Sequence, residues 1–167
     1  MATTEEIKGW LAGRIPADWF EGTPEVLVDR EEIVVVGGLP DVKPADGADE
    51  AAAQAGRIKQ HREATRDARV RIAREAQGRF GRTVSWGAAC GDTRELFTHL
   101  SVPMMTRLRI TDRQILDALV DAGVARSRSH ALAWCVRLVA KHQGDWVREL
   151  KDAVAKVEQV RANGPEV

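Results

Sequence analysis

Basic side chains are the groups in this sequence whose number and spacing could do chemistry, because they gather in two stretches. Residues 54–82 hold nine arginines and lysines against three acidic residues, and residues 104–142 hold seven against three. The whole chain is balanced, with 25 basic and 25 acidic side chains, since residues 1–53 carry twelve acidic and four basic ones. A local basic surface attracts phosphate groups within about a Debye length, ~8 Å at physiological salt. The two stretches therefore predict where an anionic partner binds.

Groups suited to catalysis are much sparser. Two pairs of neighbouring carboxylates could work as acid and base, but no nucleophile or phosphate-binding loop lies near either pair in the sequence. These pairs are Asp92 with Glu95, and Glu31 with Glu32. We therefore expect no catalytic residues and no enzymatic activity.

Metal and disulfide chemistry are not supported by the spacing either. Cys90 and Cys135 lie far apart in the chain, which predicts two free thiols rather than a disulfide framework. His130, His142 and Cys135 share no ligand spacing with a further candidate. We expect no metal site and no cofactor.

Length and hydropathy predict a folded protein outside the membrane. The 167 residues are 44% hydrophobic, enough for a buried core in one large domain or two small ones. No apolar run approaches the ~20 residues that a membrane span needs, and the first eight residues are polar and acidic, unlike a signal peptide. The expected location is the cytoplasm.

Residues 1–100 are predicted to form an α+β domain. Thr3 or Thr4 can cap a short helix that ends near Gly13, and the β-branched runs 26–28 and 33–36 suggest a hairpin. Residues 39–50 are rich in Pro, Gly and acid and suggest a flexible loop, whereas residues 50–80 suggest one long helix followed by a strand at 83–86. Three arginines share one side of that helix and are candidate auxiliary phosphate contacts: Arg62, Arg66 and Arg69.

Residues 101–142 carry the most informative pattern. Thr106, Leu108 and Ile110 alternate with Met105, Arg107 and Arg109, so a strand would bury the first set and expose the second. Thr111 or Asp112 can then cap a helix that Gly123 closes, and Ser127 or Ser129 can cap a second helix. Residues 143–167 predict a C-terminal amphipathic helix and tail, whose apolar stripe packs on the N-terminal domain or on a dimer mate.

This segment resembles the ribbon-helix-helix DNA-binding proteins of the Arc and MetJ repressor type. The residues that carry the resemblance are Arg109-Ile110-Thr111-Asp112, Gly123 and Ser127-Arg128-Ser129, and the likeness covers about 40 residues, from 104 to 142. It implies a homodimer in which two strands pair as an antiparallel ribbon and enter the DNA major groove. On this sequence the implied base contacts are Met105, Arg107 and Arg109.

The resemblance also implies phosphate contacts at the start of the second helix. Its backbone N–H groups and positive dipole end would bind a DNA phosphate, and the residues involved are Arg126, Ser127, Arg128 and Ser129. One structural alternative stays open. The strand can pair with a second copy, or with strand 83–86 of its own chain, which would remove the free edge that the ribbon needs.

The leading functional expectation is a homodimeric, sequence-specific DNA-binding protein, a transcriptional regulator of the repressor kind, whose N-terminal domain stabilises it or senses a protein partner or effector. One alternative is the antitoxin of a toxin–antitoxin pair, since the same unit serves there. Another is a protein or RNA interaction module without DNA readout.

Overall fold

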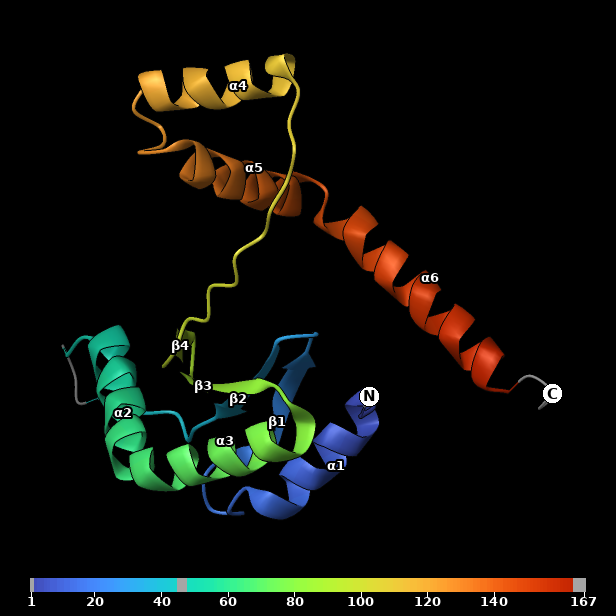
Figure 1. The fold of residues 1–167 in the computed structure, drawn as a ribbon. Helices are drawn as coiled ribbons and strands as arrows, with labels where there is room; N and C mark the ends of the chain where they lie inside the picture. The colour runs from blue at the N-terminus through green and yellow to red at the C-terminus, as the bar shows by residue number, and fades with distance from the viewer. Residues whose placement is uncertain (1, 45–47, 164–167) are drawn as a thin grey trace. The chain divides into compact units, whose positions relative to one another are not determined.

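The computed structural model describes residues 2–44 and 48–163 and divides between Pro103 and Met104 into two units. We call them the N-terminal unit and the C-terminal unit and describe each by itself. Within the described residues the chain is a mixed α+β protein with six helices and one four-stranded sheet, which confirms the expected class (Figure 1). None of the described helices combines the length and the apolar composition needed to cross a membrane.

The sheet lies entirely in the N-terminal unit and has the order β1-β2-β3-β4. Its strands are β1 (Glu21–Val28), β2 (Glu32–Gly38), β3 (Thr83–Cys90) and β4 (Thr93–Leu96). The predicted hairpin is confirmed as β1 and β2, which pair antiparallel with Val28 opposite Ile33. Asp29 closes its turn by accepting hydrogen bonds from the backbone N–H groups of Glu31 and Glu32 at 2.9 and 2.6 Å.

Strand β3 confirms the strand expected at 83–86 and lies between two neighbours. It runs parallel to β2 and antiparallel to β4, a short strand that the sequence pattern did not predict. Both edges of the sheet are irregular or short. The edge strand β1 contains Pro24 within a register shift, and the edge strand β4 has only four residues.

Three helices surround the core of the N-terminal unit. Helix α1 (Thr4–Arg14) begins at the predicted cap Thr3, whose hydroxyl accepts from the N–H of Glu6. Helices α2 (Glu50–Ala64) and α3 (Arg66–Phe80) form the crossover between the parallel strands β2 and β3. Because apolar residues alternate along β2 and β3, one face of the sheet packs on these helices. The buried core residues there are Ile7, Leu11, Ile33, Val35, Ile72, Ala76, Val84 and Trp86.

The prediction of one long helix over residues 50–80 is wrong, because the chain bends at Thr65 (Figure 1). Thr65 has φ −98° and ψ −1°, and its hydroxyl donates to the carbonyl of His61 at 2.7 Å. The guanidinium of Arg69 reaches back over the bend and donates to the Arg62 carbonyl at 2.6 Å and to Thr65 Oγ1 at 2.9 Å. These bonds satisfy groups at the break that a continuous helix would satisfy itself.

The loop expected to be flexible over residues 39–50 is fastened at both ends. Leu39 is buried and its N–H donates to the Ala89 carbonyl at 2.7 Å, while Asp49 caps α2 by accepting from the N–H groups of Ala51 and Ala52. Residues 45–47 of that prediction lie outside the described residues. The described residues 39–44 form no helix or strand, as expected of a loop, and its flexibility stays a prediction.

The C-terminal unit contains an extended segment and three helices. These are α4 (Ile110–Asp121), α5 (Arg128–His142) and α6 (Gly144–Ala162), and the positive φ of +72° at Gly123 confirms the glycine stop after the first of them. Within one chain the strand expected at 104–110 does not form, since residues 101–109 carry no β-ladder hydrogen bonds and Ile110 already begins α4. The expected cap at Thr111 or Asp112 is wrong. Arg109 is the N-cap, and Asp112 accepts from its N–H at 3.2 Å.

Candidate nucleic-acid interface

The segment that precedes α4 is extended and open to solvent. Met104 and Met105 are 85% and 98% exposed, and the side chains of Arg107 and Arg109 are exposed as well. Strand β3 has β2 and β4 as its two neighbours, so residues 104–109 do not join the sheet of their own chain. The three side chains predicted to contact bases are therefore accessible, and the backbone beside them is available for pairing.

Leu108 anchors this segment to the helices. It is half-buried and packs against the cluster formed by Leu116, Ala125 and Ala131, while its neighbours on either side stay exposed. Arg113 of α4 also fixes Leu108, because its Nη1 donates to the Leu108 carbonyl at 2.8 Å. The inward Leu108 between outward Arg107 and Arg109 agrees with the predicted alternation at these three residues. Thr106 and Ile110 were predicted to be buried with Leu108, and this is wrong: both are exposed, since no strand forms and Ile110 already begins α4.

The second part of the candidate interface is the N-terminus of α5. Ser127 is the N-cap, with its Oγ accepting from the His130 N–H at 3.2 Å, which selects Ser127 over Ser129 as the cap. The N–H of Arg126 donates to Nδ1 of His130 at 3.3 Å. The first N–H groups of a helix have no intrahelical acceptor, and here they belong to exposed residues such as Arg128 and Ser129. An anion can bind there.

Arg128 has a structural partner that the sequence reading missed. Its guanidinium makes a two-point ion pair with Asp117 of α4, with distances of 2.6 and 2.7 Å. Hydrogen bonding, reinforced by the opposite charge, raises the pKa of Arg128 above its usual value and lowers the pKa of Asp117. Both side chains stay substantially exposed, so the pair aligns α4 and α5 but contributes little to stability.

A groove joins the two parts of the candidate interface. It has a volume of about 350 Å³ and is open to solvent. Met105 and Thr106 line it from the extended segment, Arg113 from α4, and Arg128 and Ser129 from α5. The structure thus brings a predicted base contact and two predicted phosphate contacts to the same surface of the C-terminal unit.

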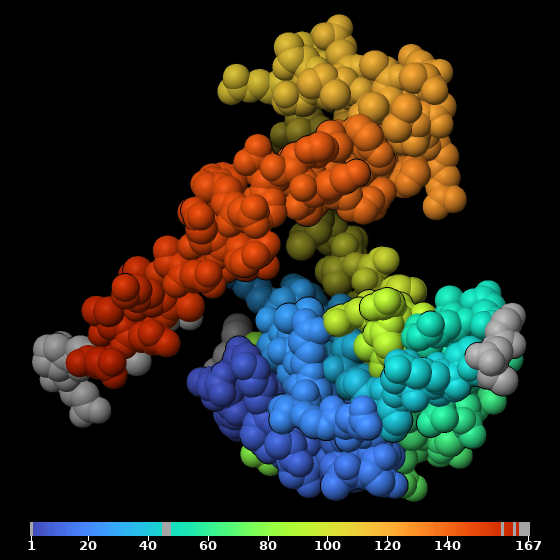
Figure 2. All heavy atoms as spheres, turned by 180° about the vertical axis from the view of Figure 1, so that it is seen from behind, coloured from blue at the N-terminus to red at the C-terminus, as the bar shows by residue number. Residues whose placement is uncertain are grey.

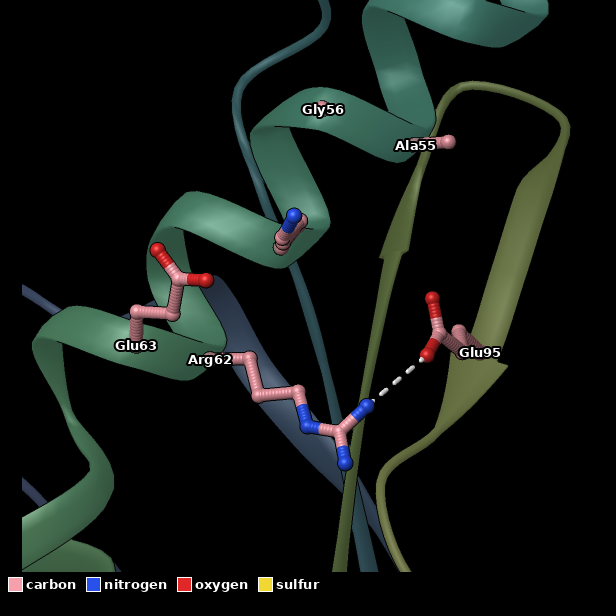
Figure 3. Close-up of a pocket in the computed structure, with 6 residues that line it drawn as sticks. Ala55, Gly56, Arg62, Glu63 and Glu95 are labelled. Carbon is pink, nitrogen blue, oxygen red and sulfur yellow. Dashed lines mark hydrogen bonds and ion pairs between the residues drawn. The ribbon is translucent and has the colours of Figure 1, made fainter.

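The three arginines predicted as auxiliary phosphate contacts have different surroundings in the N-terminal unit. Arg66 is exposed, with Asp67 at 3.7 Å, whereas Arg69 is only 7% exposed and its guanidinium lies 4.7 Å from the ring centre of Phe97. Arg62 forms an ion pair with Glu95 at 3.3 Å (Figure 3). Only Arg66 offers a largely exposed guanidinium to a phosphate.

The same ion pair borders a surface pocket between α2 and β4. Its volume is about 520 Å³, and its charged lining residues are Lys59, Arg62, Glu63 and Glu95 (Figure 3). Two basic and two acidic side chains leave no net attraction for an anion, and no nucleophile lines the pocket. Among the described residues no three His, Cys, Asp or Glu side chains come together as a metal site.

His61 is the titratable group with the most unusual surroundings. It packs against Phe20, Trp19 and Phe97 with ring centres 5.2, 6.0 and 6.5 Å away, and its Nε2 is buried without a hydrogen-bond partner. Burial, and secondarily the positive charge of Arg69, lowers the pKa of His61. It lies in the N-terminal unit and has no substrate-binding partner around it, so we assign it a role in the fold.

Three residues that matter here escaped the sequence reading. Asp117 pairs with Arg128, and Arg113 bonds to the Leu108 carbonyl, so both fix the geometry of the C-terminal unit. Phe97 packs against Arg62, Arg69 and His61 near the bend between α2 and α3. The only signal for Asp117 was its place on a helix that must fold back on α5 across Gly123. Nothing local distinguishes Phe97.

Comparison with known proteins gives two family matches and several close relatives. A family described as "Rv1265-like protein, N-terminal domain" matches residues 5–96, and one described as "Mb1296 C-terminal domain" matches residues 109–161. The uncharacterized protein Rv1265 of Mycobacterium tuberculosis H37Rv and the uncharacterized protein Mb1296 of Mycobacterium bovis are each 54% identical to this chain over 159 residues. The alignment covers 95% of this chain and 70% of each relative. No solved structure matches this chain.

Proposed function

This chain belongs to the Rv1265-like family, and we propose that it is a homodimeric, sequence-specific DNA-binding protein that regulates transcription. In this proposal the segments 104–109 of two copies pair as an antiparallel ribbon that enters the major groove. The N-terminus of α5 binds the flanking phosphate. The observation that carries the proposal is the exposed, unpaired segment with Leu108 turned inward and Arg107 and Arg109 turned outward.

The backbone of the segment supports pairing with a second copy. Arg109 has φ −76° and ψ 170°, an extended conformation, and the sheet of the N-terminal unit leaves residues 104–109 unpaired. An extended strand with free N–H and C=O groups is a template for another strand. Two copies related by a two-fold axis would satisfy both sets of groups at once.

The small core of the C-terminal unit also favours a dimer. Over residues 104–163 the buried hydrophobic side chains are Leu116, Ala125 and Ala131, two of them only alanines. A unit of about 60 residues is marginal even with a full core, because it buries a small share of its surface. Large apolar side chains meanwhile remain outside, each more than half exposed: Ile110, Ile115, Val136 and Val139. A second copy packed on these residues would complete the core.

The side chains on the outer face of the proposed ribbon suit base recognition. Arginine can donate two hydrogen bonds to O6 and N7 of guanine, which is worth about 1–3 kcal/mol of discrimination for each good pair. Methionine can contact the thymine methyl group. Arg107 and Arg109 make no ion pair within the described chain, so their guanidinium groups need not leave an internal partner.

Phosphate binding is assigned to the start of α5. Arg128 and Ser129, which carry the first N–H groups of the helix, line the same groove as Met105, and the exposed Arg126 precedes them in the chain. Arg128 itself is already paired with Asp117, so its main task in this proposal is to orient the helix and its guanidinium contributes less than that of Arg126. In this proposal α5 positions the protein on the DNA backbone, and the ribbon reads the base sequence.

The test is a binding-site selection from random duplex DNA with the full chain and three variants. We expect Arg107→Ala and Arg109→Ala to relax the selected sequence at defined positions. Arg126→Ala should weaken binding to all sequences and reduce the salt slope by about one. Arg137→Ala, an exposed arginine further along α5, is the matched control and should change neither property.

The outcome that refutes the proposal is equally specific. If the wild-type chain selects no sequence, or if both strand variants select the same sequence as wild type, the ribbon does not read bases. Parallel titrations with single-stranded RNA show whether the surface prefers RNA, which would also reject the proposal.

A further inference from the structure

Helix α6 exposes an apolar stripe that nothing in the C-terminal unit covers. None of its described side chains is buried, although Trp146, Leu150 and Val157 are large or branched and are 57%, 47% and 52% exposed. Figure 2 shows α6 as a rod of atoms that extends away from α5. Most helices in proteins are stabilised by packing of an apolar face rather than by intrinsic propensity. The stripe therefore needs a partner.

The spacing of the stripe identifies the kind of partner. Its members follow one another in steps of four, three, four and three residues, which is the alternation of a and d positions in a heptad repeat. These a and d positions are Trp146, Leu150, Ala153, Val157 and Val160. Val154, which is 57% exposed, lies beside them at an e position. This pattern is typical of a helix that packs lengthwise on another helix, with side chains of one entering gaps of the other.

We propose that α6 pairs with α6 of a second copy of this chain in an antiparallel helix pair. In the proposed register Leu150 lies opposite Ala153 of the second copy, and Trp146 lies opposite Val157. A large side chain meets a small or medium one in each layer, as close packing requires. The two-fold axis repeats each layer, so four layers form from one 12-residue overlap of about 18 Å.

Charge distinguishes this arrangement from the parallel one. Glu149 and Lys156 occupy g positions beside the stripe, and g positions face each other in an antiparallel pair. Glu149 of each copy then lies opposite Lys156 of the other. In a parallel pair a g residue faces the e residue five positions later, which would place Lys156 against Arg161 of the second copy. The sequence therefore favours the antiparallel pair, with two attractive contacts.

These two charges are available for such a contact. Within the described part of α6 the recorded ion pair joins Asp145 and Arg148 at 2.9 Å, and both of these residues lie away from the stripe. Glu149 and Lys156 have no ion pair inside the described chain. The overlap is short, so we expect reversible association that depends on protein concentration. This surface uses none of the residues of the ribbon and does not depend on DNA binding.

The first test measures self-association of the full chain by sedimentation equilibrium, in wild type and in a Thr106→Pro background. Proline removes a backbone N–H that the ribbon would use, so association that remains in that background comes from α6 or from the exposed apolar side chains of α4 and α5. The charge variants of α6 distinguish these two sources. Glu149→Lys and Lys156→Glu should each weaken the association about tenfold, since two attractive contacts become repulsive. The double variant should restore it. Arg148→Glu, the same charge change on the outer side of α6, should have no effect.

Three results would overturn the proposal. They are a Thr106→Pro chain that stays monomeric at all concentrations although circular dichroism shows its helices intact, a Lys156→Glu variant that associates more strongly, and a double variant that fails to recover. Failure of the DNA-binding proposal would appear separately, in the binding-site selection.

A second test keeps the ribbon intact. In a Cys135→Ser background, a Leu150→Cys chain is mixed with a tagged Ala153→Cys chain under mild oxidation. The proposed register predicts disulfides between the two kinds of chain. Disulfides formed instead within each kind alone would indicate a parallel pair, and the absence of any cross-link would reject the contact.

Discussion

Removal of the Arg69 guanidinium should destabilise the N-terminal unit more than any other arginine truncation in it. Arg69 donates to the Arg62 carbonyl at 2.6 Å and to Thr65 Oγ1 at 2.9 Å, and it stacks on Phe97. Hydrogen bonds from a charged donor contribute about 1.5–3 kcal/mol each, and a cation–π contact about 0.5–2 kcal/mol. The freed carbonyl and hydroxyl can recover some hydration, so we expect Arg69→Ala to lower the free energy of unfolding by roughly 2–4 kcal/mol.

The assay is urea unfolding of the full chain at 25 °C, followed by tryptophan fluorescence. Trp19 and Trp86 report on this unit, because their rings are 5.9 Å apart next to the same core. Arg66→Ala is the matched control, since Arg66 lies one turn away on α3 and is exposed, and it should change the stability by less than about 0.5 kcal/mol. Arg69→Met, which keeps most of the aliphatic stem, should fall between the two.

Equal stabilities of Arg69→Ala and Arg66→Ala would refute this reasoning, because the buried bonds at the bend would then contribute nothing. The same pair of variants bears on DNA binding. Once the folded fraction is taken into account, Arg69→Ala should leave the affinity for duplex DNA unchanged, since its guanidinium is turned into the fold. Arg66→Ala is the variant of the two that can lose a phosphate contact.

Two further outcomes follow from the structure. Ser127→Ala should lower the stability of the C-terminal unit by about 1 kcal/mol through loss of the α5 cap, and thermal unfolding beside the nearly neutral Ser129→Ala checks it. Because burial lowers the pKa of His61, the unfolded chain binds a proton there more readily, and the stability of the N-terminal unit should fall as pH drops below about 6.5. His61→Gln should flatten that decline in urea unfolding at pH 7.5 and 5.5; an unchanged slope would contradict the assignment.

Local signals in the sequence were sufficient for several elements of the fold. The two β-branched runs predicted the hairpin, Thr3 and Ser127 were recognisable as helix caps, and Gly123 adopts the positive φ expected of a helix stop. The caps and helix stops depend on residues within four positions of one another, and the two runs of the hairpin are separated by only four residues. Short-range chemistry determines them, so they can be deduced without knowledge of tertiary contacts.

Features that depend on distant contacts could not be deduced in the same way. The bend at Thr65 has no Pro or Gly to announce it, and it is stabilised by Arg69 with help from Phe97, which lies 28 residues further along the chain. Strand β4 is too short to show a period of two, and it forms because β3 offers it an edge. The missed Leu39 is fixed by a bond to Ala89 on β3.

The candidate interface also combines features that local sequence determines with features that depend on distant contacts. The alternation around Leu108 is local, and it placed Arg107 and Arg109 on the outer side as predicted. The pairing of Arg128 with Asp117 requires α4 and α5 to meet, which is a property of their packing. In the single chain residues 104–109 are extended and form no strand, and their pairing with a second chain stays a prediction.

The short or irregular edge strands of the N-terminal sheet reduce the tendency of this protein to aggregate. Strand β1 contains Pro24 and a register shift, and β4 offers only four residues, two of them charged. Such edges are poor templates for a foreign strand. If the edges were long and regular, the exposed extended segment 104–109 of one copy could add to the sheet of another, and repeated addition would produce fibres. The edges of this sheet therefore compete little for residues 104–109, as the proposed pairing of that segment with a second copy requires.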